Sequence, residues 1–170
     1  MKNRNHLLIT IGAAFLLFLF LRSKMAYKVT GKLNADQLKY KQLIADLARA
    51  NGYSDVAFLQ GLSLAESSLD PKAVSSKTSY GLFQIFHAPN FSWLRWAGYK
   101  NEDFQKLFDP TFNTNLAIKV IRYFEGRGFV FPKNADIYNV GEKKWADGVR
   151  NVDYRTKVNK YTQAFAKGEL

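Results

Sequence analysis

The sequence predicts a mainly α-helical domain over residues 34–170. Apolar residues recur at spacings of three and four in several segments, as expected for helices with one buried face. Capping residues such as asparagine, serine and aspartate precede some of these segments. Residues 70–80, rich in serine, lysine and threonine, instead predict a loop with at most a small hairpin. A chain of 170 residues is long enough for one domain with a proper core.

The N-terminal segment is the most apolar part of the chain. Residues 7–21 read LLITIGAAFLLFLFL, with Lys2 and Arg4 before them and Arg22 and Lys24 after them. As a helix this stretch rises about 22 Å. It contains fewer than the ~20 residues usually needed to span a membrane, but snorkelling basic residues extend its reach. A cleavable signal peptide is the alternative. Because Arg22 follows at once and no clean Ala-x-Ala site is present, we expect residues 1–26 to form an uncleaved transmembrane anchor.

Residues 27–33 form a short polar linker, and the first helix of the domain is expected after it. Asn34 and Gln37 have the spacing of a capping box, in which each side chain bonds the other residue's backbone N–H. An amphipathic stripe follows, and Asn51-Gly52 is a typical helix end. The stripe consists of Tyr40, Leu43, Ile44, Leu47 and Ala48.

The second helix is expected to begin at Ser54 as the N-cap, with Asp55 in its first turn. Pro71 should end it at about Asp70, because the residue before proline avoids the α conformation. One face of this helix carries Leu59, Leu62, Glu66 and Leu69.

Glu66 therefore lies on an otherwise apolar stripe. Desolvation favours the protonated form of a carboxyl group, which general acid catalysis requires. Taken alone, such a glutamate is more often a partly exposed or hydrogen-bonded structural residue.

Further helices are predicted near residues 102–107, 113–125, 134–140 and 153–166. An aromatic-rich stretch precedes them, and its rings suit either sugar stacking or the core. Its members are Phe91, Trp93, Trp96 and Tyr99.

Composition excludes several chemistries. Without cysteine there is no thiol catalysis, disulfide or cysteine zinc site. His6 and His87 are the only histidines, so a histidine metal cluster or a serine triad is disfavoured. We expect no cofactor and no metal. The net charge of +11 suits anionic polymers and lipid headgroups, and no nucleic-acid motif is present.

The segment AESSLDPKAVSSKTSYGLFQIF resembles the catalytic stretch of the lytic transglycosylase family, whose fold is related to goose-type lysozyme. Asp70 and Phe83 depart from the family pattern, which commonly has asparagine and methionine there, and Tyr80 is also unusual. The residues that match in register are Glu66, Ser67, Pro71, Ala73, Ser75, Gly81, Leu82, Gln84 and Ile85.

Later blocks follow in the family's order, so that the resemblance covers roughly residues 36–165. Phe108-Asp109-Pro110, followed by Asn113 or Asn115, is similar to an Asp-Pro-x-x-Asn helix. Residues 137–141, IYNVG, resemble Ala-Tyr-Asn-Ala-Gly, and residues 153–155, DYR, resemble Glu-Thr-Arg. Lys157 stands where the family commonly has tyrosine.

The resemblance implies a lysozyme-like helical domain, here preceded by an N-terminal transmembrane helix. It implies that Glu66 serves alone as acid and then as base, cleaving a peptidoglycan β-1,4 bond to leave a 1,6-anhydro end. Most other glycosidases use two carboxylates, and the role of Asp70 stays open. The residues expected to bind substrate are Ser75, Gly81, Phe83, Gln84, Tyr138 and Asn139.

The expected partners are peptidoglycan glycan strands, the lipid membrane through residues 7–21, and proteins of a virion or secretion machine. The catalytic domain should face the peptidoglycan from a virion membrane or a bacterial inner membrane. Two alternatives stay open: a hydrolytic muramidase that uses water, and a non-catalytic peptidoglycan-binding membrane protein.

Overall fold

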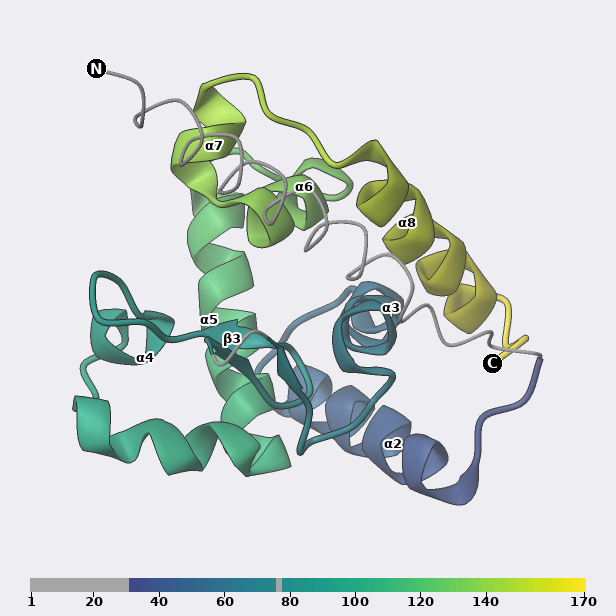
Figure 1. The fold of residues 1–170 in the computed structure, drawn as a ribbon. Helices are drawn as coiled ribbons and strands as arrows, with labels where there is room; N and C mark the ends of the chain where they lie inside the picture. The colour runs from purple at the N-terminus through teal and green to yellow at the C-terminus, as the bar shows by residue number, and fades with distance from the viewer. Residues whose placement is uncertain (1–30, 76–77) are drawn as a thin grey trace, which may run out of the picture. The chain divides into compact units, whose positions relative to one another are not determined.

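The computed structural model describes residues 31–75 and 78–170 and confirms a mainly helical domain with a small sheet (Figure 1). The predicted anchor, including its apolar residues 7–21, lies outside the described residues. Within the described ranges no helix combines the length and apolarity needed to cross a bilayer. The helices are α2 (Ala35–Ala50), α3 (Val56–Ser67), α4 (Trp93–Trp96), the 3₁₀ helix η1 (Asn101–Phe108), α5 (Pro110–Gly126), α6 (Lys133–Val140), α7 (Glu142–Ala146) and α8 (Val152–Ala166).

Helix α3 lies in the middle of the domain, with α8 on one side, the sheet on the other and α2 beneath it in the view of Figure 1. Its residues from Phe58 to Ala65 are all buried. Gly61 lets α8 approach closely, since a Cβ at this position would lie 2.7 Å from the backbone nitrogen of Thr162. This central placement fixes the position of Glu66, which follows the buried run by one residue.

The start of α2 agrees with the prediction. Asn34 Oδ1 accepts from the Gln37 N–H at 2.9 Å, and Gln37 Oε1 accepts from the Asn34 N–H at 3.0 Å, which completes the capping box. Asn51 is the C-cap, and Gly52 adopts a positive φ of 63°. Local sequence therefore determines both ends of this helix.

The predicted bounds of α3 were wrong at both ends. Asp55 is the N-cap instead of Ser54, and its carboxylate accepts from the Phe58 N–H at 2.9 Å. The helix ends at Ser67 instead of about Asp70, because Ser68 and Leu69 turn into the left-handed region at φ values of 59° and 63°. This early turn returns the Leu69 side chain to the core, where it is buried.

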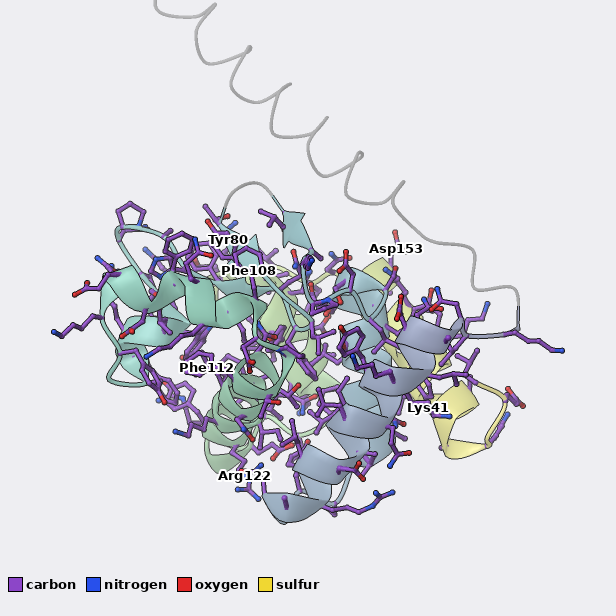
Figure 2. The ribbon with its side chains drawn as sticks, turned by 90° about the horizontal axis from the view of Figure 1, so that it is seen from below. Lys41, Tyr80, Phe108, Phe112, Arg122 and Asp153 are labelled. Carbon is purple, nitrogen blue, oxygen red and sulfur yellow. The ribbon has the colours of Figure 1, made fainter. Side chains whose placement is uncertain are left out.

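The sheet is larger than the hairpin that was expected. Strands β1 (Val74–Ser75), β2 (Ser79–Tyr80) and β3 (Ile85–Phe86) are antiparallel in that order, with Ser75 opposite Ser79 and Tyr80 opposite Ile85. The third strand forms because residues 81–84 turn the chain back. Tyr80 anchors this end of the sheet by packing edge-on against Phe108, with ring centroids 5.6 Å apart (Figure 2).

The C-terminal helices match their predicted positions to within a few residues, whereas the short helices α4 and α7 were not predicted. Asp109 caps α5 by accepting from the Phe112 N–H at 2.6 Å, with Pro110 in the first turn. Helices α6 and α8 are joined by an ion pair between Asp136, which is buried, and Arg155. This pair connects α6 to α8, the helix that packs along α3.

Candidate active site

Glu66 lies in the last turn of α3 and is half-buried. The hydroxyl of Tyr154, in the first turn of α8, donates to Glu66 Oε1 at a distance of 2.5 Å. A hydrogen bond to a carboxylate is among the stronger kinds in proteins and restricts the side chain's orientation. Glu66 is therefore held by a residue 88 positions later in the chain.

The turn at residues 81–84 is built around Gly81 and Asn113. Gly81 has a φ of 76°, and a Cβ there would lie 2.2 Å from the Leu107 carbonyl oxygen and 2.4 Å from Asn113 Nδ2. Asn113 is completely buried; its Oδ1 accepts from the Phe83 N–H at 2.9 Å, and its Nδ2 donates to the carbonyls of Tyr80 and Leu107. Only glycine fits at position 81, and the amide of Asn113 fixes the turn around it.

The same turn is fastened to α3 and α6. The hydroxyls of Ser63 and Ser67 donate to the Leu82 carbonyl at 3.1 and 2.7 Å. The Tyr138 hydroxyl donates to the Phe83 carbonyl at 2.7 Å. Burial, with the negative charge of Glu66 as a second cause, raises the pKa of Tyr138 well above its usual value, so this phenol stays protonated. The turn, Tyr138 and Glu66 thus form one connected arrangement.

The predicted substrate-binding residues occupy different settings. Phe83 has its ring in the core, with no exposed surface, and Gln84 is 6% exposed with its Nε2 donating to the carbonyls of Ala73 and Gly81. Ser75 has a buried hydroxyl without a hydrogen-bond partner in the described part of the chain. Asn139 is half-buried and accepts from Asn151 Nδ2 at 2.8 Å. In this structure Phe83, Gln84 and Gly81 shape the turn, and contact of the predicted residues with substrate stays a prediction.

Two residues near Glu66 were not predicted as functional: Tyr154 and Lys157. The ammonium of Lys157 donates to the Ala65 carbonyl at 2.7 Å, at the C-terminal end of α3. Burial lowers the pKa of Lys157, and the charge of Glu66 opposes that shift. The sequence signal was the block at residues 153–158, where Tyr154 and Lys157 both replace the residues common in the resembled family.

Comparison with known families gives the decisive observation. The family model described as the transglycosylase SLT domain matches residues 44–160. The chain belongs to this family. No curated protein and no solved structure gives a match. The matched range contains α3, the sheet, α6 and most of α8, and it includes Glu66, Tyr138, Tyr154 and Lys157.

Two other acidic side chains of the SLT domain, those of Asp70 and Asp136, each have a hydrogen-bond or ion-pair partner. Asp70, four residues after Glu66, is exposed and accepts from the Lys72 N–H at 2.8 Å in a turn. Asp136 is paired with Arg155. A pocket of about 440 Å³ between α2 and α5 is lined by none of the predicted site residues. The SLT match supports activity on the glycan strands of peptidoglycan, and the assignment of this chemistry to Glu66 stays a prediction.

Proposed function

We propose that Glu66 is the single acid–base residue of a peptidoglycan lytic transglycosylase that forms 1,6-anhydro ends. The observation that carries this proposal is the hydrogen bond from Tyr154 to Glu66 Oε1, within a domain of the transglycosylase family. This hydrogen bond supports the view that the Glu66 carboxyl group is held in one orientation at the end of the buried helix α3. Oriented proton donors of this kind contribute about 10²- to 10⁴-fold to rate.

The reaction proceeds in two proton transfers. Protonated Glu66 gives its proton to the oxygen that leaves C1 of N-acetylmuramic acid, and the C1–O4 bond to N-acetylglucosamine breaks. The substrate's own N-acetyl oxygen supports the positive charge at C1. The ionised Glu66 then accepts the proton of the sugar's 6-hydroxyl, whose oxygen bonds to C1. The anhydro product forms, Glu66 is protonated again, and no water is consumed.

We further propose that residues 1–26 anchor the enzyme in a membrane, with the SLT domain facing the wall. The apolar residues 7–21, flanked by basic residues, support this placement. A small anchored domain suits local opening of peptidoglycan during phage entry or during assembly of an envelope-spanning machine. Proteins of that virion or machine are then its partners.

The test is Glu66→Gln, which keeps the side chain's shape and removes the acid. We expect peptidoglycan binding to persist and cleavage to fall at least about 10²-fold. Asp70→Asn is the matched control: it changes a carboxylate to an amide four residues away, and its activity should stay near that of the wild type. Equal activity of the Glu66 variant and the wild type would exclude Glu66 as the acid.

Mass spectrometry of the digest separates the alternatives. Anhydro ends are lighter than reducing ends by one water. Digests in which anhydro ends predominate support the transglycosylase, whereas reducing ends alone would identify a hydrolytic muramidase. A wild-type protein that binds walls and releases no fragments would be a non-catalytic binding protein.

A further inference from the structure

The first turns of α8 bring a phenol and an ammonium to the end of α3. Tyr154 and Lys157 are three residues apart and therefore share a face of α8. The Tyr154 hydroxyl reaches Glu66 Oε1 at 2.5 Å, and the Lys157 ammonium reaches the Ala65 carbonyl at 2.7 Å, one residue before Glu66. Both side chains are half-buried, so solvent screens their effect on Glu66 only in part.

We propose that Tyr154 and Lys157 are positioning residues that stabilise the ionised Glu66 left by its acid step and hold it in place for the base step. This inference rests on the proposed function of Glu66. The Tyr154 hydroxyl stabilises the ionised carboxylate by donating a hydrogen bond to it, and it fixes the direction of the oxygen that must accept the 6-hydroxyl proton. Lys157 adds a positive charge beside the same carboxylate.

Lys157 owes its position to the helix end as well as to Glu66. The last carbonyls of a helix lack intrahelical partners, and the C-terminal end carries partial negative charge. The ammonium satisfies one of these carbonyls, which holds the cation beside Glu66 despite the cost of burial. That cost is visible in the lowered pKa of Lys157, which Glu66 offsets in part.

The groups around Glu66 differ in what they can contribute to its ionisation. Burial and the charge of Glu66 raise the pKa of Tyr138 of α6, but the Tyr138 hydroxyl donates to the Phe83 carbonyl and not to Glu66 Oε1. From α2, the uncharged Gln37 donates to the Ser68 carbonyl at the end of α3. Asp70, beyond the helix end, bonds the backbone of Lys72. Tyr154 donates to the Glu66 carboxylate and Lys157 places a positive charge near it, and both residues belong to α8.

Loss of Tyr154 or Lys157 should change the pH dependence of the reaction through Glu66. A donated hydrogen bond and a nearby cation both favour the ionised form of a carboxyl group. Removing either one makes Glu66 hold its proton to higher pH. Since activity requires Glu66 to start protonated, the alkaline limb of the pH–rate profile should move to higher pH. The maximal rate should fall at the same time, because the oriented base is lost.

The experiment measures kcat, KM and the pH–rate profile of the full-length chain on isolated peptidoglycan, by counting anhydro ends. For Tyr154→Phe we expect kcat to fall roughly ten- to a hundredfold, the range for loss of one hydrogen bond to a charged group, with KM nearly unchanged and the alkaline limb shifted upward. Lys157→Met should shift the same limb, and Lys157→Arg, which keeps the charge, should restore it towards the wild-type position.

Thermal unfolding of each variant separates a role at Glu66 from a role in folding. A merely structural role would lower the unfolding temperature and leave the limb in place. If folded Tyr154→Phe keeps the wild-type limb and a kcat within about twofold, the inference is overturned, although loss of activity in Glu66→Gln would still uphold the proposed function. Retained activity in Glu66→Gln would remove both.

Discussion

At the scale of single residues, Asn113 holds the turn at residues 81–84 in place. A buried amide that satisfies three backbone groups is costly to remove, because each group left without a partner keeps its full desolvation penalty. Those three groups belong to Tyr80 before the turn at residues 81–84, Phe83 within it and Leu107 in η1. Asn113 therefore carries the position of the turn and of β3.

We predict that Asn113→Ala lowers the free energy of unfolding by about 3 kcal/mol, from unsatisfied buried groups and lost packing. Urea unfolding followed by circular dichroism measures the change. Asn115→Ala is the matched control, because Asn115 is only half-buried and pairs with exposed Asn51. It should cost less than about 1 kcal/mol. Equal losses in the two variants would contradict the assignment of Asn113 as the centre of the turn.

At the scale of elements, the parts that sequence predicted are those whose causes are local. The capping box of α2 lies within four residues, and the pattern Asn34…Gln37 was sufficient to find it. The end of α3 was missed because distant partners help determine it: Gln37 donates to the Ser68 carbonyl at 3.1 Å, and Leu69 returns to the core. Strand β3 was missed for the same reason, because Asn113 holds the turn before it.

The candidate site also combines residues that local sequence predicts with residues that only distant contacts bring together. Glu66 could be predicted from an apolar stripe and a family resemblance within one segment. Its partner Tyr154 could not, because the hydrogen bond spans 88 residues and depends on the close contact of α3 with α8 at Gly61. Gln84 matches the family pattern and Phe83 departs from it, yet in this structure the hydrogen bonds of Gln84 hold the turn and the buried Phe83 ring lies in the core.

The capping box gives a prediction for α2. Asn34→Ala should destabilise the domain by about 1 kcal/mol, because it leaves the Gln37 N–H without its partner. Asn34→Asp keeps an acceptor at the N-cap and should be close to neutral. Thermal unfolding of both variants measures the difference, and activity at low temperature should be unchanged in each. A loss in the Asp variant as large as in the Ala variant would show that the cap is not the cause.

At the scale of the whole molecule, charge is distributed in a way that suits a wall polymer. The net charge is +11, and residues 1–30 contain five lysines and arginines and no acidic residue, which leaves +6 on residues 31–170. The folded domain is therefore basic by itself, and this charge favours anionic polymers without a contribution from the N-terminal segment.

The ion pair between Asp136 and Arg155 connects the C-terminal helix to the rest of the site. Asp136 is 1% exposed, and its Oδ1 has no hydrogen-bond partner in the described ranges, so Arg155 is the group that compensates its charge there. Removing the cation alone leaves a buried charge uncompensated, which typically costs about 3–5 kcal/mol. Because α6 carries Tyr138 and α8 carries Tyr154, this pair also holds together two of the residues around Glu66.

We therefore predict that Arg155→Met destabilises the protein by about 3 kcal/mol and lowers activity, whereas the double variant Asp136→Asn, Arg155→Met recovers much of that stability because no buried charge remains. Urea unfolding of the two single variants and the double variant gives the coupling energy. Lys160→Met, an exposed position on α8, is the control and should stay within about 0.5 kcal/mol of the wild type. If the double variant is as unstable as the sum of the two single variants, the pair does not connect α6 to α8.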